Sequence, residues 1–213
     1  MSNSLYNYIA VEGNIGAGKT SLVTLLGKKL GYATLFEEFE SNPFLTDFYK
    51  DIKKHAFPVE MFFLAERYKQ LTNAKPDDGN EKPKLVADYF ILKSLIFASF
   101  TLDSIEFGLF KRFFDVIQEK VFLPDLIIYL ERENDYLLGN IQNRGRAYEA
   151  FIQPDYLSKV NEGYREFFKN EVRMPVIIIN IGNKDVFEPL VLEALIAKVF
   201  TKKWANGVQR IDL

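Results

Sequence analysis

Cysteine is absent from this 213-residue chain, and histidine occurs once, at position 55. Without cysteine the chain has no disulfide, no thiolate-bound zinc and no thiol nucleophile, and a single histidine excludes a metal cluster of several histidines. We expect His55 in a surface turn. No stretch reaches the 18 apolar residues of a membrane-spanning helix, and residues 1–8 are polar, unlike a secretory leader. These absences predict a cytoplasmic protein with no membrane partner.

Neither sign of charge dominates the sequence. Its 29 acidic and 27 basic side chains give a formal net charge of −2, which provides no general attraction to a polyanion, so we expect no nucleic-acid partner. Apolar residues make up 48% of the chain and aromatic residues 15%, enough for one sizeable core. The composition therefore favours a single domain over residues 1–213.

Short apolar segments alternate with helical patterns along the chain. Five segments have the composition of strands covered on both faces, namely 7–12, 33–37, 84–88, 126–131 and 176–181. Helical patterns occupy 19–30, 42–54, 59–72, 92–118, 136–143, 155–170 and 184–200. This alternation predicts an α/β fold with a five-stranded, parallel sheet flanked by helices.

A phosphate-binding loop follows the first predicted strand. The stretch GNIGAGKT satisfies the pattern GxxxxGK[ST] and opens into a helical pattern, as this motif requires. Backbone N–H groups of such a loop surround phosphate oxygens, the lysine reaches the β and γ phosphates, and the hydroxyl can bind Mg²⁺. The motif predicts a P-loop NTPase that uses ATP and Mg²⁺. Its nucleotide-binding residues are Gly13, Asn14, Ile15, Gly16, Ala17, Gly18, Lys19 and Thr20.

A P-loop identifies the phosphate donor but leaves the acceptor open among GTPases, motor ATPases, nucleotide kinases and small-molecule kinases. Two predicted strands end in acidic residues, at Glu37-Glu38 and at Asp88. The carboxyl ends of parallel strands meet at one edge of the sheet, where α/β folds bind ligands. We expect Asp88 to hold Mg²⁺ together with Thr20, and Glu37 to accept the proton of an attacking hydroxyl. The alternative is that Glu37 and Glu38 are surface charges beside a helix.

Two arginines flank a glycine in a later segment. Arg144 and Arg146 stand on either side of Gly145, and guanidinium groups stabilise charge on a phosphoryl group in transit. A segment of this kind can close over the donor phosphates and exclude water. We therefore predict a lid at about residues 142–152 with two catalytic arginines.

The order of these motifs resembles the deoxynucleoside kinases, in particular the bacterial deoxyadenosine and deoxyguanosine kinases. The similarity covers about residues 7–170 and rests on four stretches: GNIGAGKT, FEEFESNPFLTDFY, FPVEMFFLAERYKQL and IQNRGRAYEAFIQPDYL. It implies a five-stranded parallel sheet and transfer of the γ-phosphate of ATP to the 5′-hydroxyl of a deoxynucleoside. It also implies a homodimer built from helices, which we expect to use residues 92–118.

The resemblance also assigns roles to single residues. Glu37 matches the general base, and the two arginines of the predicted lid match the family's lid arginines. Tyr49 and Glu149 match residues that hold the deoxyribose 3′-hydroxyl. Glu60 and Arg67 match residues that read the base.

Three positions depart from the family's pattern. Tyr89 stands where an arginine usually follows the acidic residue after the third strand, and Asn140 replaces a lid arginine. Each change removes a cation from the transferring phosphate, so we expect a slower or narrower enzyme. Glu60 replaces a glutamine. An ionised glutamate presents two acceptors, which suit the adjacent N1–H and 2-amino donors of guanine, so we predict a purine substrate, with deoxyguanosine preferred to deoxyadenosine.

Two other functions remain open from the sequence. A nucleoside-monophosphate kinase of the thymidylate type would need cations to bind the acceptor's phosphate, and the acidic Glu37, Glu38 and Glu60 argue against it. A catalytically weak protein that uses its P-loop as a regulatory switch would fit the missing arginine at Tyr89.

Overall fold

A parallel β-sheet forms the centre of the protein. The computed structural model describes residues 5–74, 82–170, 172–182 and 184–213. In the sheet the strand order is β2-β3-β1-β4-β5-β6, and every neighbouring pair is parallel. The strands are β1 (Tyr8–Gly13), β2 (Ala33–Leu35), β3 (Leu85–Ala87), β4 (Leu126–Glu131), β5 (Pro175–Asn180) and β6 (Gly207–Asp212).

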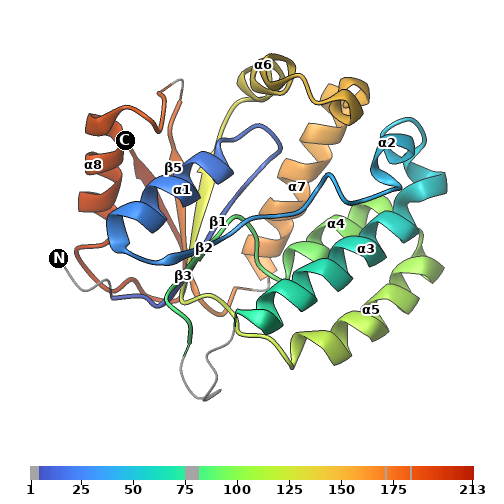
Figure 1. Cartoon of the computed structure of the whole chain (residues 1–213), viewed down its shortest axis with the longest axis horizontal. Helices are drawn as coiled ribbons and strands as arrows, with labels where there is room; N and C mark the ends of the chain where they lie inside the picture. Colours follow the sequence, from blue (N-terminus) through green and yellow to red (C-terminus); the bar gives the residue numbers. More distant parts are fainter. Residues whose placement is uncertain (1–4, 75–81, 171, 183) are drawn as a thin grey trace.

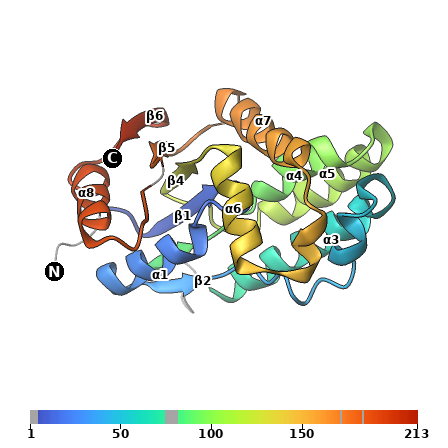
Figure 2. The ribbon, with the colours of Figure 1, turned by 90° about the horizontal axis from the view of Figure 1, so that it is seen from above.

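Helices cover both faces of this sheet. Figures 1 and 2 show α1 and α8 on one side, with α3, α4, α5 and α7 on the other. The helices are α1 (Lys19–Leu30), α2 (Leu45–Phe48), α3 (Ile52–Asn73), α4 (Lys93–Thr101), α5 (Ser104–Gln118), α6 (Asn134–Arg144), a 3₁₀ helix η1 (Ala147–Phe151), α7 (Pro154–Asn170) and α8 (Pro189–Val199). None of those in the described part of the chain has both the length and the apolar character to cross a bilayer.

The two central strands carry the core. All of β1 is buried, and β4 is buried up to its last residue. Strand β1 lies between β3 and β4, with Ile9 level with Val86 on one side and Leu126 on the other. Because these strands are parallel, the segments that follow β1, β3 and β4 all leave the same edge of the sheet.

The sheet has six strands, whereas five were predicted. Strand β6 pairs with β5 from Pro175 and Gly207 through to Asn180 and Asp212. Its sequence, GVQRID, has no apolar run, and its residues alternate between half-buried and exposed. Such a segment becomes a strand because β5 offers it a row of backbone hydrogen-bonding groups, which is a tertiary effect.

Two predicted helices are interrupted by aspartate caps. The predicted helix 42–54 is only the short α2, and α3 starts afresh behind Asp51, whose carboxylate accepts a hydrogen bond from the Lys54 backbone N–H over 3.3 Å. The predicted helix 92–118 breaks into α4 and α5 at Asp103, which forms a capping box with Glu106. Both breaks follow from side chains that satisfy the free N–H groups of a helix start.

Helix α3 also runs through Pro58, which lies in the gap between the predicted helices 42–54 and 59–72. Pro58 removes one backbone hydrogen bond from the helix interior. Ala56 and Val59 on either side of it are buried in the core, and this packing keeps the helix continuous. His55 consequently lies in α3 rather than in the predicted surface turn.

Candidate active site

A cavity of about 320 Å³ opens at the carboxyl edge of the sheet. Its walls come from the P-loop, the segment after β2, helices α3, α4 and α6, and the segments that follow α6 and β5. Most of the residues predicted for the site line this cavity. They are Gly13, Ile15, Gly16, Ala17, Gly18, Lys19, Thr20, Glu37, Tyr49, Glu60, Arg67, Arg144 and Glu149.

One position of the loop between β1 and α1 requires glycine. Gly16 has a φ of +82°, and a Cβ added there would lie 2.7 Å from the carbonyl oxygen of Leu137, so the position requires glycine. The Asn14 side chain donates hydrogen bonds to the Leu157 carbonyl over 2.8 Å and to Asn161 Oδ1 over 2.7 Å. Asn14 therefore fixes the loop against α7.

Lys19 folds back over the loop. Its Nζ donates hydrogen bonds to the carbonyl oxygens of Gly13 at 3.0 Å and Asn14 at 2.9 Å. Burial, followed by the nearby charge of Lys93, lowers the pKa of Lys19 to about 8. An anionic ligand in the loop would favour the charged form of this lysine.

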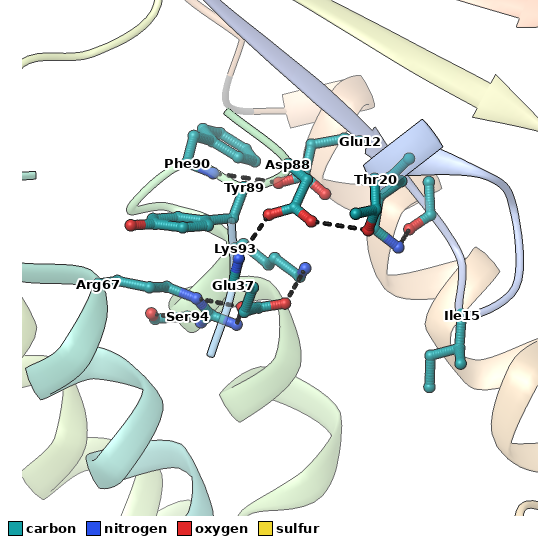
Figure 3. A network of polar contacts seen from close by, with 12 residues as sticks. Glu12, Ile15, Thr20, Glu37, Arg67, Asp88, Tyr89, Phe90, Lys93 and Ser94 are labelled. Carbon is teal, nitrogen blue, oxygen red and sulfur yellow. Dashed lines mark hydrogen bonds and ion pairs between the residues drawn. The ribbon is translucent and has the colours of Figure 1, made fainter. Parts of the chain in front are cut away.

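Thr20 and Asp88 bring two oxygen ligands together. The Thr20 hydroxyl donates a hydrogen bond to Asp88 Oδ2 over 2.9 Å, and the other oxygen of Asp88 accepts one from the Glu37 backbone N–H over 2.7 Å (Figure 3). Burial and the charge of Glu37 raise the pKa of the Asp88 carboxyl. The pair of a hydroxyl and a carboxylate is a set of hard oxygen donors that suits Mg²⁺.

Glu37 lies at the centre of a buried ionic network. Strand β2 ends at Leu35, so Glu37 belongs to the coil that follows the strand. One of its oxygens accepts a hydrogen bond from Arg67 Nε over 2.7 Å, and the other accepts one from Lys93 Nζ over 2.7 Å (Figure 3). Burial by itself would raise the pKa of Glu37, but the charges of Arg67 and Lys93 lower it to about 2. The surface-charge reading of Glu37 is therefore wrong, because the side chain is buried and ionised, whereas Glu38 is exposed.

Arg67 forms its hydrogen bonds with Glu37 and Ser94 rather than with Glu60, the other residue that the resemblance assigns to base reading. It donates to Glu37 through Nε and through a second guanidinium nitrogen, and its third nitrogen donates to Ser94 Oγ over 2.7 Å. Glu60, two turns earlier on the same face of α3, instead accepts a hydrogen bond from the Thr101 hydroxyl over 3.0 Å. Burial raises the pKa of Glu60 to about 7, against the opposing charge of Arg67.

The predicted lid segment carries an ion pair of its own. Arg144 donates from Nε to Glu149 over 2.6 Å and makes a second contact with the same carboxylate. Arg146 is not among the residues that line the cavity. Its guanidinium lies 3.7 Å from Glu149 and over the ring of Phe39, 5.5 Å from the ring centre. The two arginines therefore occupy different surroundings.

Tyr49 closes the cavity on the side of α2. Its ring packs edge-to-face on Tyr156, with 5.7 Å between ring centres. Burial and the nearby Glu149 carboxylate raise the pKa of the Tyr49 hydroxyl well above its usual range. Tyr49 and Glu149 thus share one region of the cavity, as the resemblance implies.

Three residues that the sequence analysis did not select as site residues also line this cavity. Lys93 is described above. Asn140 donates a hydrogen bond to the Gly16 carbonyl over 2.8 Å, so it joins α6 to the P-loop. Arg132 stacks on Tyr136 at 4.1 Å and donates to the Lys184 carbonyl over 2.8 Å. Nothing in the local sequence marks Lys93 or Arg132, and Asn140 was noted only as the replacement of a lid arginine, since each role depends on a contact between distant segments.

Comparison with known proteins gives the family. A family model described as deoxynucleoside kinase matches residues 9–203. The chain is 36% identical to the deoxyguanosine kinase of Bacillus subtilis (strain 168) over 182 residues, which cover 84% of this chain and 88% of that protein. The chain belongs to the deoxynucleoside kinase family. It is therefore a phosphotransferase that acts on a hydroxyl group.

Other members of the family have similar levels of sequence identity to the chain. A deoxyadenosine kinase of Dictyostelium discoideum is 33% identical over 81% of this chain and 71% of its own length. A solved structure of the deoxyadenosine kinase from M. mycoides with bound dCTP has a TM-score of 0.76 and 29% sequence identity, and the match covers 90% of this chain and 98% of that one. The parallel sheet flanked by helices is thus the fold of this kinase family.

Proposed function

We propose that this kinase transfers the γ-phosphate of ATP to the 5′-hydroxyl of a purine deoxynucleoside, with deoxyguanosine preferred. One observation carries the proposal: the P-loop, the ionised Glu37 and the buried Glu60 line a single cavity. In the reaction a bond forms between the 5′-oxygen and the γ-phosphorus, and the bond from that phosphorus to the β–γ bridging oxygen breaks. The proton of the hydroxyl goes to Glu37.

The donor side of the cavity suits ATP with Mg²⁺. The P-loop amides and Lys19 would bind the phosphates, and Thr20 and Asp88 would hold the ion. Mg²⁺ commonly takes one or two protein ligands and completes its shell with phosphate oxygens and water. A bound ion would neutralise charge that develops on the phosphates.

The acceptor side suits a deoxynucleoside. Glu37 is buried beside Asp88 and stays ionised, so it orients a hydroxyl and takes its proton as the new bond forms. Tyr49 and Glu149 would hold the 3′-hydroxyl, and Arg67 would lie beside the base while it holds Glu37. The acidic side chains on this side of the cavity, Glu37, Glu60 and Glu149, favour a nucleoside over a nucleoside monophosphate, whose phosphate they would repel.

Glu60 supports the purine preference. The side chain is buried between α3 and the end of α4, and its carboxylate form presents only acceptors. Guanine offers two adjacent donors to such a group. Among the named relatives, the deoxyguanosine kinase of Bacillus subtilis and the deoxyadenosine kinase of Dictyostelium discoideum both act on purines.

We further propose that residues 142–152 act as a lid of this single kinase domain. The segment contains the end of α6, the left-handed Gly145 and η1. Arg144, held by Glu149, points into the cavity, where it can contact the phosphoryl group. The Arg144–Glu149 pair would bring that cation and the sugar-binding carboxylate into place together.

The homodimer is also a proposal. Helix α5 exposes an apolar stripe at helical spacing, formed by Ile105, Leu109, Phe113 and Val116, with Ile105 83% exposed and Val116 67% exposed. A second copy of the chain would cover it, and the net charge of −2 opposes such pairing only weakly. The cytoplasmic location and the absence of a nucleic-acid partner stay predictions from the composition.

A product assay tests the function directly. The pure protein is incubated with ATP, Mg²⁺ and each deoxynucleoside or its monophosphate, and the products are resolved. We expect deoxyguanosine monophosphate to form fastest. Formation of a nucleoside diphosphate alone would support the thymidylate-type alternative, and binding of ATP without any product would support a regulatory nucleotide-binding protein.

A further inference from the structure

Lys93 places a cation beside Glu37, although Tyr89 stands where the family usually has an arginine. Lys93 is the first residue of α4, and its side chain is only 5% exposed although it carries a charge. Its ammonium lies 2.7 Å from Glu37 Oε2 and lines the cavity. Burying an ammonium group costs free energy unless the group is paired. The Glu37 carboxylate provides such a pair for Lys93.

The turn after β3 explains why Lys93 rather than Tyr89 reaches the site. The Phe90 N–H donates to the buried Glu12 carboxylate over 3.2 Å, and the Lys93 N–H donates to the Phe90 carbonyl over 3.1 Å. The chain therefore turns back on itself between positions 88 and 93. The Tyr89 side chain points away from Lys93 (Figure 3). Its hydroxyl donates a hydrogen bond to Gln70 of α3.

Lys93 is close both to Glu37 and to the P-loop. It contacts Glu37, which faces the acceptor, and its charge is near enough to Lys19 of the P-loop to lower the pKa of that lysine. An ammonium has three N–H donors. Within the described part of the chain, its one hydrogen bond as a donor is to Glu37, which leaves two donors for a ligand.

We propose that Lys93 is a catalytic residue of the reaction described above: it holds the Glu37 carboxylate toward the acceptor hydroxyl and contacts the phosphoryl group that moves from ATP. The inference rests on the proposed function. The missing arginine at Tyr89 led us to expect a site with too few cations. We infer instead that Lys93, four residues after Tyr89, supplies the cation. Charge on the equatorial oxygens of the moving phosphoryl group is then met by Lys19 on one side and Lys93 on the other.

The test compares Lys93→Met with two controls, Lys53→Met on the exposed side of α3 and Tyr89→Phe. Methionine keeps the length of the lysine stem and removes only the charge. We expect Lys93→Met to lower kcat by on the order of 10²- to 10³-fold, with KM for the deoxynucleoside within a few-fold of the parent. Both controls are expected to stay within about threefold of the parent in kcat, since neither side chain faces the cavity.

A second variant separates chemistry from a merely structural role. Lys93→Ala should recover part of its kcat when methylammonium is added, because the small cation can enter the space left by the side chain, and Lys53→Met should not respond. Folded Lys93→Met with kcat within threefold of the parent would overturn the inference, as would Lys93→Ala that no alkylammonium restores. A parent protein that forms no deoxynucleoside monophosphate would instead overturn the proposed function.

Discussion

Thr101 donates a hydrogen bond to Glu60 over 3.0 Å and thereby joins the end of α4 to the middle of α3 beneath the cavity. The contact satisfies one oxygen of a carboxyl group that burial would otherwise leave costly to ionise. Among the described residues the other oxygen accepts no hydrogen bond, so it can face a ligand. The ionisation of Glu60 therefore connects the stability of this region with the choice of base.

We expect the preference for guanine over adenine to rise with pH. The pKa of Glu60 is about 7, raised by burial, against the lowering charges of Arg67 and Lys93 and with Glu37 and Thr101 nearby. Below that pH the protonated group presents a donor and an acceptor, as glutamine does, and above it only acceptors. Between pH 6 and pH 8 the ionised fraction rises by about tenfold and the protonated fraction falls by about tenfold. The ratio of kcat/KM for deoxyguanosine to that for deoxyadenosine should therefore rise by up to about 100-fold.

Glu60→Gln should remove this pH dependence and shift the ratio toward deoxyadenosine. Glu66→Gln, on α3 but outside the cavity lining, is the matched control and should keep the parental slope. A ratio that Glu60→Gln leaves unchanged at both pH values would show that Glu60 does not read the base.

The same group should affect stability. The folded-state pKa of Glu60 lies above the usual value of 4.5, so its contribution favours the folded state below pH 4.5 and is lost as the pH rises through about 7. At about 1.4 kcal/mol per pKa unit, ionisation of Glu60 removes on the order of 3 kcal/mol. Urea unfolding of the parent and of Glu60→Gln should show the variant gaining relative to the parent from pH 5 to pH 8.

Glu37→Gln should lower kcat by on the order of 10²-fold or more while KM stays within a few-fold, the usual range for loss of a general base. The variant leaves Arg67 and Lys93 short of a negative partner, so its unfolding free energy must be measured beside its activity. Glu38→Gln, exposed one residue later, is the control. If Glu38→Gln lowers kcat and Glu37→Gln does not, the general base is Glu38.

Substitution of the two lid arginines should lower kcat by different factors. Arg144 lines the cavity, and we expect Arg144→Ala to lower kcat by on the order of 10²-fold with little change in KM, because guanidinium contacts strengthen in the transition state. Arg146→Ala should lower kcat by less than about tenfold. A higher KM with unchanged kcat in Arg144→Ala would contradict a transition-state role.

The apolar stripe of α5 predicts a dimer. Light scattering at micromolar concentration should give twice the 24.7 kDa mass of one chain. Phe113→Glu would place a charge in the stripe and should yield monomers, whereas Leu190→Glu, on the exposed side of α8, should not. A parent protein that scatters as a monomer would rule out the interface.

Local patterns predicted the elements that depend on local chemistry. Helix α1 and strand β4 have the bounds predicted for them, because a P-loop opens a helix and an apolar run fills the core. Strand β6 was missed because it owes its form to β5. The predicted set of site residues was incomplete for the same reason, since a contact between distant segments decides which residues reach the cavity. Lys93 has no motif around it, and only the folded turn shows that its ammonium, rather than a group at Tyr89, lies beside Glu37.

Strand β6 has a consequence for the solubility of shortened chains. Strand β5 is PVIIIN, buried up to its last residue, and it would become the outer strand if the last seven residues were removed. Its free backbone groups and isoleucines would then invite another chain to pair with them, which is how sheet edges aggregate. With β6 in place, the edge instead carries Gln209, Arg210 and Asp212. The C-terminal segment, which holds no residue of the cavity, thus keeps the sheets of neighbouring molecules apart.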